Sequence, residues 1–289
     1  MEEIKNRKII LVPVDFSETS RNAVRYAVEV AKHKNAKIVL MHAYMSGQNF
    51  LDMSGQLLAQ NVLETKEQAE TGLDKMAEEF VGNKLLFKKI CKFGTLQDAI
   101  KEFTSQYRTW MIIMGTDSSG KLNELLGSSS TAEIAGKLNV PLLAIPFNYK
   151  YKGIRQIAFA TDYHDSDLGS LKFIARLAEL FSAHINVIHI ADGDFTMGFE
   201  KEQMNNFKKD AAEKIEYKKI SYQVILGNHV LHRLEKFLDA ENPDMLAMAT
   251  KHYSFIEKLL HKSITRKMIY HTHVPLMIFH FKDELVYHM

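Results

Sequence analysis

A loop rich in glycine and hydroxyl residues is the part of this sequence best suited to chemistry. It runs from Gly115 to Thr131 and reads GTDSSGKLNELLGSSST. Glycines let the backbone approach an anion closely, and a helix that begins in the serine cluster would offer amides and hydroxyls to a phosphate. The loop therefore predicts a phosphate site. The alternative is that the serines only cap the helix and the glycines only turn the chain.

The same loop argues against a P-loop nucleoside triphosphatase. Gly115 to Lys121 matches the start of that motif, G-x-x-x-x-G-K, but the next position must be Ser or Thr to hold the magnesium ion. Leu122 stands there, and the segment up to Leu126 separates the lysine from the serine cluster. In a true P-loop the helix would follow the glycines directly, so this match is incidental.

The segments that must position this loop occur twice in the chain. Val12–Asp15 recurs as Phe159–Asp162, and Leu40–Ala43 recurs as Val187–Ile190, both at an offset of 147. Three later blocks recur at an offset of 134, so the second copy is 13 residues shorter (147 − 134) between the two sets. These blocks begin at Met114, Leu125 and Val140. A fixed long-period repeat predicts two homologous domains, here residues 1–147 and 153–289.

Each copy alternates apolar strands with amphipathic helices. In the first copy we predict strands at 8–12, 38–43, 85–91, 110–114 and 142–145, and helices at 17–31, 57–80, 95–105 and 128–138. The second copy repeats this order, with strands near residues 157, 185, 223, 245 and 276. The alternation predicts two tandem α/β units, each an open five-stranded parallel sheet with helices on both faces. Ligands bind such sheets at the carboxyl ends of the strands, which points to Asp15, His42 and the loop from Gly115.

Charge and cysteine content restrict the partners. The first copy, up to residue 149, has 18 basic and 17 acidic residues, and the remainder has 19 and 18. Neither copy offers a basic face, so no nucleic-acid partner is predicted. Cys91 is the only cysteine, which rules out an intrachain disulfide. We expect a cytoplasmic protein without a membrane span, because the sequence shows no signal peptide and no long apolar run.

The histidines are concentrated in the second copy. Eleven of the 13 lie after residue 150, and His229-x-x-His232 and His271-x-His273 have spacings that suggest metal binding. Neither pair comes with cysteine or with carboxylates at ligand spacing, so we predict no metal site and interpret the pairs as incidental. His42 and His189 end equivalent strands and are interpreted as satisfied histidines at the rim of the core.

Five motifs together resemble the universal stress protein family. They are Val12–Ser17, Met41–Ala43, Met114–Thr116, Leu126–Thr131 and Val140–Leu143. The similarity covers both copies, so the chain resembles a tandem universal stress protein with the Rossmann-like fold of the adenine nucleotide alpha-hydrolases. In nucleotide-binding members the loop after the fourth strand follows G-x2-G-x9-G-S/T, and the aspartate after the first strand lies near the adenine.

The resemblance implies that the first copy binds an adenine nucleotide, with ATP and Mg²⁺ as the expected cofactors. The implied nucleotide-binding residues are Val14, Asp15, Met114, Gly115, Thr116, Ser118, Gly120, Gly127, Ser128, Ser129, Ser130 and Thr131. Asp15 has an alternative interpretation, because an aspartate at this place can simply accept hydrogen bonds from the start of the next helix. The same holds for Asp162, with Ser166 as a further capping candidate.

Both copies depart from the family pattern. From Gly115 to Gly127 there are 12 positions where the pattern has 13, and Ser118 replaces the second glycine. In the second copy Ala249 replaces Gly115 and His252 replaces Ser118. At the end of the loop, His261 replaces Gly127 and Lys262 replaces Ser128. Side chains then stand where the family uses bare backbone. We therefore predict nucleotide binding in the first copy and loss of the triphosphate mode in the second.

No nucleophile–base pair or paired carboxylates support strong catalysis, so we predict a non-enzymatic stress-response protein with slow ATP hydrolysis at most. The second copy would regulate or bind an unidentified protein partner. Two alternatives stay open: a nucleotide-free interaction module, and a small-molecule or lipid-binding protein that uses a cleft in the second copy. Family domains commonly pair through the last strand, so Leu142–Ile145 and Leu276–Phe279 are expected to meet in an intrachain pseudo-dimer, with a homodimer as a further option.

Overall fold

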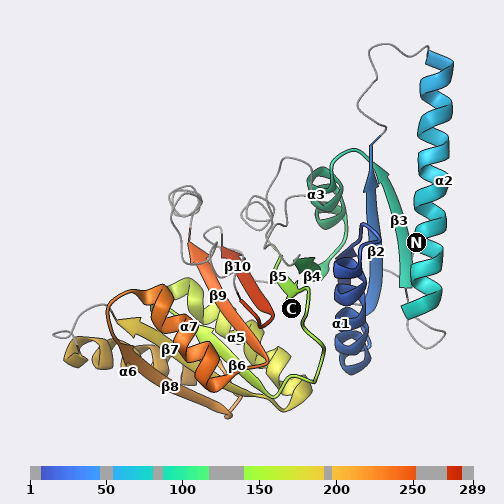
Figure 1. The fold of residues 1–289 in the computed structure, drawn as a ribbon. Helices are drawn as coiled ribbons and strands as arrows, with labels where there is room; N and C mark the ends of the chain where they lie inside the picture. Colours follow the sequence, from blue (N-terminus) through green and yellow to red (C-terminus); the bar gives the residue numbers. More distant parts are fainter. Residues whose placement is uncertain are drawn as a thin grey trace. The chain divides into compact units, whose positions relative to one another are not determined.

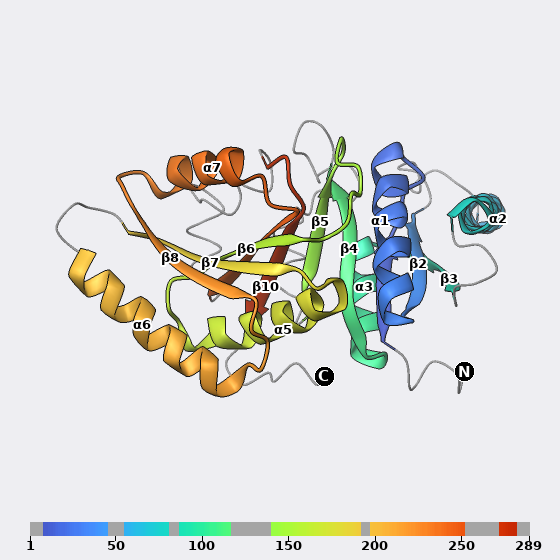
Figure 2. The same cartoon turned by 90° about the horizontal axis from the view of Figure 1, so that it is seen from below.

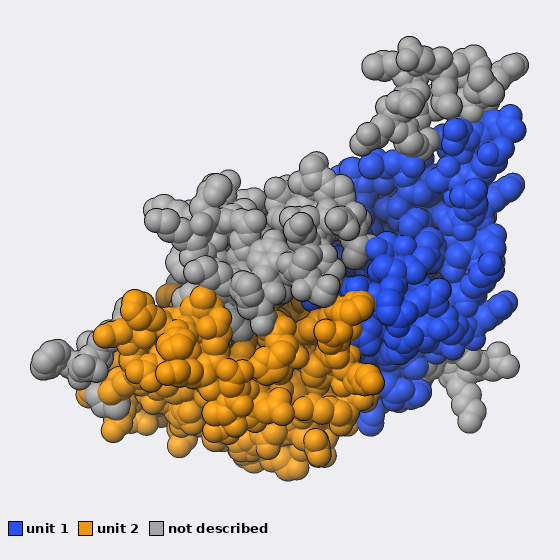
Figure 3. Space-filling view, viewed as in Figure 1, with its two compact units in different colours: residues 1–134 blue, residues 135–289 orange. Residues whose placement is uncertain are grey.

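The computed structural model describes residues 8–45, 55–80, 87–116, 140–191, 197–251 and 272–281. The chain forms two compact units, residues 1–134 and 135–289, which Figure 3 colours separately. Much of the predicted phosphate loop lies outside the described residues. This applies to Ser118, Gly120, Gly127, Ser128, Ser129, Ser130 and Thr131, to the helix predicted at 128–138, and to His252, His261 and Lys262.

Unit 1 alternates strands and helices along the chain (Figure 1). Its elements are β1 (Ile9–Pro13), α1 (Glu18–Lys34), β2 (Lys37–Tyr44), α2 (Gly55–Phe80), β3 (Phe87–Phe93), α3 (Leu96–Gln106) and β4 (Thr109–Thr116). The strands lie in the order β3-β2-β1-β4, and β1 pairs in parallel with both β2 and β4. Helices α1 and α2 contact each other over one face, and the chain then crosses back through α3 to β4.

Local sequence explains where these elements begin. All five residues of β1 are buried, as expected of a continuous apolar strand in a parallel sheet covered on both faces. Ser17 and Thr95, the first residues of two predicted helices, cap α1 and α3, and each accepts a hydrogen bond from a backbone N–H in the first turn. Strand β3 was predicted at residues 85–91 and lies two residues later. No described helix is both long and apolar enough to span a membrane.

Unit 2 contains one strand more than the second sequence repeat. Its elements are β5 (Leu142–Pro146), β6 (Gln156–Ala160), α5 (Asp165–Phe181), β7 (His184–Ala191), α6 (Met197–Lys214), β8 (Ile220–Leu226), α7 (Val230–Glu241), β9 (Met245–Lys251) and β10 (Leu276–Phe281). The strand order is β5-β10-β9-β6-β7-β8. Figure 2 shows α5 and α6 on one face of this sheet and α7 on the other. The predicted fold class, parallel sheets with helices on both faces, is confirmed.

The additional strand β5 is the last strand of the first repeat. It pairs with β10, the last strand of the second repeat, and this is the one antiparallel pair among the described strands of unit 2. Leu143 lies opposite Met277 in this pair, and neither side chain is exposed. The expectation that the two final strands meet is thus confirmed. The segment between the two repeats is held to the same unit, because the Tyr149 hydroxyl donates a hydrogen bond to the carbonyl oxygen of Asp244 at 3.2 Å.

This pairing predicts that β5 stabilises unit 2. A fragment of residues 140–289 should unfold at a higher denaturant concentration than a fragment of residues 153–289. The shorter fragment exposes the edge of β10 and loses the buried side chains of Leu142 and Leu143. Urea unfolding followed by circular dichroism measures the difference. Equal unfolding midpoints would show that β5 contributes nothing to this unit.

Candidate functional site

The carboxyl edge of the sheet in unit 1 brings two predicted site segments together. Val14 and Asp15 follow β1 directly, and Gly115 and Thr116 end the neighbouring strand β4. The chain winds from β1 outward to β2 and β3, and then returns to the other side of β1. Such a reversal is the switch point at which open α/β sheets bind ligands. The described part of the predicted site therefore lies where the fold favours a ligand.

Asp15 uses one carboxylate oxygen to build the start of α1. Its Oδ1 accepts a hydrogen bond from the Ser17 backbone N–H at 3.0 Å and another from the Ser17 hydroxyl at 2.5 Å. Ser17 Oγ in turn accepts a hydrogen bond from the Ser20 backbone N–H at 3.2 Å. Among the described residues, Asp15 Oδ2 has no hydrogen-bond partner. The helix-start interpretation therefore holds for one of the two carboxylate oxygens.

A histidine on β2 fixes the turn that carries Asp15. Nδ1 of His42 lies 2.7 Å from the carbonyl oxygen of Val14. A carbonyl can only accept, so this ring nitrogen carries the hydrogen. Phe16, at a φ of 67°, places its ring 4.5 Å from the imidazole, centroid to centroid. Gly72 of α2 makes room for Phe16, because a Cβ atom there would lie 2.7 Å from Phe16 Cζ. His42 is a satisfied rim histidine, as predicted.

Packing by itself is enough to require a glycine at position 115. A Cβ atom at this position would lie 2.4 Å from the carbonyl oxygen of Thr19 and 2.5 Å from its Cγ2. The absence of a side chain lets the first turn of α1 lie against β4. Met114 and Val14 are 2% and 3% exposed, so their side chains belong to the core and only their backbone can contribute to a ligand site. Thr116 is also buried.

The second repeat preserves the histidine-fixed turn. Nδ1 of His189 lies 2.7 Å from the carbonyl oxygen of Thr161. Tyr163 has a φ of 62°, and its ring centroid lies 4.2 Å from that of the imidazole. Each of these residues lies 147 positions after its counterpart in the first repeat. The sequence offset therefore corresponds to one shared three-dimensional device.

Helix α6 changes what covers this turn in the second repeat. Glu200 Oε2 lies 3.2 Å from Nε2 of His189, and the two side chains are only 17% and 12% exposed. The Tyr163 hydroxyl donates to the Glu200 carbonyl oxygen at 3.4 Å. Burial and the nearby carboxylates of Glu200 and Asp162 raise the pKa of Tyr163, so the phenol stays neutral. Among the described residues, His42 has no such carboxylate partner.

The start of α5 differs from our expectation. Ser166 was a candidate cap, but the N-cap residue is His164, and the carboxylate of Asp167 reaches back to the turn. Asp167 Oδ2 accepts hydrogen bonds from the Thr161 hydroxyl at 2.7 Å and the Asp162 backbone N–H at 3.1 Å. Asp162 is left with a side chain that is 75% exposed. Burial raises the pKa of Asp167, and these hydrogen bonds oppose the rise.

Both sequence repeats match the model of one known protein family. The sequence model described as the universal stress protein family matches residues 6–146 and, separately, residues 153–280. The chain belongs to the universal stress protein family. It carries two universal stress protein domains in tandem, as the repeat predicted.

Similar proteins cover either one domain or both. A universal stress protein of Methanocaldococcus jannaschii is 25% identical over 142 residues, which is 48% of this chain and 81% of that protein. A universal stress protein A homolog of Haemophilus influenzae is 26% identical over 143 residues, 48% of this chain and 96% of that protein. The crystal structure of a universal stress protein from Archaeoglobus fulgidus covers 97% of this chain and 98% of its own, with a TM-score of 0.73 and 17% identity. The fold is therefore shared along almost the whole chain.

Sequence reasoning missed three contributors to these sites. Phe16 and Tyr163 were not singled out, although both follow the repeated aspartate and the 147-residue offset aligns them. Glu200 gave no signal, because it lies in the stretch where the copies differ in length. Among the described residues no group of three potential ligands is placed to hold a metal ion, and His229 and His232 lie at the start of α7.

Packing at Gly115 leads to a stability prediction. Gly115→Ala should lower the free energy of unfolding by about 1–3 kcal/mol, because the new methyl group overlaps Thr19. Adding Thr19→Ser should recover only part of this loss, since the carbonyl oxygen of Thr19 stays in place. The second repeat carries Ala249 and Ser166 at the equivalent positions. Urea unfolding of the single and double variants measures the coupling, and an unaltered Gly115→Ala protein would contradict the close packing.

The buried carboxyl of Asp167 leads to a prediction about pH. A pKa raised in the folded state means that the stabilisation is complete below the unfolded pKa, about 3.9, and is lost as the pH rises through the folded pKa. The wild-type free energy of unfolding minus that of Asp167→Asn should therefore fall as the pH rises above about 4. Denaturant titrations between pH 3.5 and 8 test this. A difference that grows with pH would show that the hydrogen bonds outweigh burial.

Proposed function

We propose that this universal stress protein binds an adenine nucleotide, with ATP as the expected one, at the carboxyl edge of β1 and β4 in its first domain. Membership of the family supports a role in the stress response, and the position of Asp15 and Gly115 at the switch point supports the site. The protein would act by binding, in the cytoplasm, and any ATP hydrolysis would be slow. Mg²⁺ would accompany the triphosphate.

One observation carries this proposal: the two domains share a turn but differ in what covers it. Among the described residues of the first domain, Asp15 Oδ2 has no hydrogen-bond partner and His42 has no carboxylate partner. In the second domain Glu200 lies against His189. An adenine offers both hydrogen-bond donors and acceptors, so an unused carboxylate oxygen is a suitable partner for it. The first domain therefore fits a nucleotide better than the second.

The second domain is proposed to regulate the first or to bind a partner protein. Its counterpart of the phosphate loop lacks the family glycines, since Ala249 and His261 replace them. The exposed carboxylate of Asp162 lies beside the turn that Glu200 covers. A polar surface of this kind suits a protein partner better than it suits a triphosphate, whose charge Asp162 and Glu200 would repel.

Binding is tested with equivalent variants in the two domains. Asp15→Ala should weaken ATP binding about tenfold or more, as expected for the loss of a hydrogen bond to a charged group. Asp162→Ala removes the equivalent carboxylate of the second domain and should leave the affinity unchanged. Isothermal titration calorimetry on the full chain gives both affinities, and urea unfolding checks that Asp15→Ala keeps its fold despite losing the bonds to Ser17.

A second pair of variants tests the phosphate loop. Gly127→Val should abolish binding by blocking the approach of the backbone, while His261→Val in the second domain should have no effect. Absence of ATP binding to the wild-type protein at millimolar concentration would refute the proposal and favour a nucleotide-free interaction module. Equal losses from Asp15→Ala and Asp162→Ala would place the nucleotide elsewhere.

A further inference from the structure

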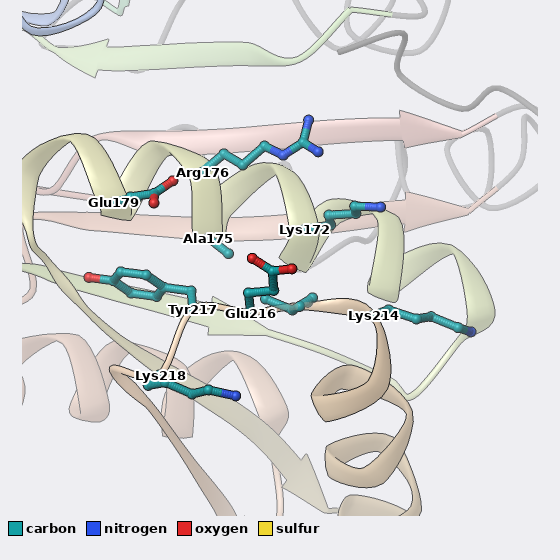
Figure 4. A pocket seen from close by; sticks show the side chains of 9 residues that line it. Lys172, Ala175, Arg176, Glu179, Lys214, Glu216, Tyr217 and Lys218 are labelled. Atoms are coloured by element: carbon teal, nitrogen blue, oxygen red, sulfur yellow. The ribbon is translucent and has the colours of Figure 1, made fainter.

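A basic surface pocket lies in unit 2, away from the carboxyl edge of the sheet. It is a cavity of about 520 Å³ between α5 and the segment that joins α6 to β8 (Figure 4). Ala175 and Ile215 are buried and line its floor. Helix α5 is followed by β7, and the segment after α6 is followed by β8. These two walls of the pocket therefore lie next to the starts of the strands, at the amino edge of the sheet. It is therefore distinct from the switch point at the opposite edge.

Hydrogen bonds hold the two walls in place. The Tyr217 hydroxyl donates to the carbonyl oxygen of Ala183, and Lys219 Nζ donates to that of Ser182 at 3.0 Å. The Ile185 backbone N–H donates to the carbonyl oxygen of Lys219 at 2.9 Å. These bonds join the end of α5 to the residues that enter β8. These bonds fix the shape of the pocket, which lowers the entropic cost of binding a ligand.

The charges of the pocket are unbalanced. Four cationic side chains line it, and they belong to Lys172, Arg176, Lys214 and Lys218. Two carboxylates, Glu179 and Glu216, oppose them. Among the described residues, Lys172, Lys214 and Lys218 make no hydrogen bond or ion pair with another side chain. The pocket thus carries a net charge of +2 (four positive minus two negative) with three lysines available to an anion.

We propose that this pocket binds a small polyanion, a metabolite with two or more phosphoryl or carboxylate groups. Three mobile ammonium groups and one guanidinium can surround several anionic groups at once. The apolar floor at Ala175 and Ile215 accommodates the body of such a molecule. The site goes beyond the proposed nucleotide site, since it uses neither the switch point nor the first domain.

The test uses the full chain and two probes, inorganic tripolyphosphate and citrate, at constant ionic strength. The backbone amide signals of Ala175 and Ile215 should shift in a saturable way in two-dimensional NMR spectra. Lys172→Gln should raise the dissociation constant about threefold or more, and Glu216→Gln should lower it, because one removes an attractive charge and the other a repulsive one. Saturation by one probe alone identifies the anionic group that the pocket prefers.

Two exposed residues of α6 that do not line the pocket supply matched controls. Lys209→Gln and Glu213→Gln make the same charge changes on the neighbouring helix α6 and should leave the dissociation constant unchanged. The proposal is overturned if neither probe produces saturable shifts at millimolar concentration. It is equally overturned if the control variants alter binding as much as the pocket variants do. That result would mean that the charged residues act only through the general charge of the surface and not through the pocket.

Discussion

The hydrogen bond from a histidine ring to the backbone just after the first strand sets the geometry of both carboxyl edges. It joins His42 to Val14 in the first repeat and His189 to Thr161 in the second, at 2.7 Å in each. The bond ties the end of one strand to its neighbour and forces the chain to turn at once. An aspartate and an aromatic residue at positive φ follow. The direction of the aspartate and the start of the next helix both depend on this turn.

The two repeats close this common turn with different residues. The first repeat uses small groups, the Ser17 hydroxyl and the bare backbone of Gly72, and one oxygen of Asp15 has no hydrogen-bond partner among the described residues. In the second repeat the turn is instead contacted by the carboxylate of Asp167 from the first turn of α5 and by that of Glu200 from α6. Both carboxylates are largely buried and held by hydrogen bonds or by a histidine, so they are part of the fold. The repeats have the same architecture, and among the described residues only the second covers this turn with the carboxylates of Asp167 and Glu200.

The sequence predicted the architecture because the repeat and the alternation of strands and helices act over long stretches. It placed the start of the first helix at Ser17, which caps α1, because a hydroxyl residue stands there before an amphipathic stretch. It did not distinguish Ser166 from Asp167, since His164 begins α5 and either residue lies in the first turn. The role of Glu200 could not be predicted. Its contact with His189 joins α6 to β7, and Glu200 lies where the two copies differ in length, so no residue of the first copy aligns with it. Such contacts become visible only when the tertiary structure is known.

We propose that the shared turn serves a nucleotide in the first repeat, whereas in the second repeat the protein's own Glu200 occupies it. The most direct measurement is a titration of the full chain with ATP, followed by NMR of histidine ring nitrogens labelled with ¹⁵N. His42→Gln and His189→Gln variants assign the two signals. The account predicts that the His42 signal shifts with ATP while the His189 signal stays in place. A shift of the His189 signal, or of neither, would contradict it.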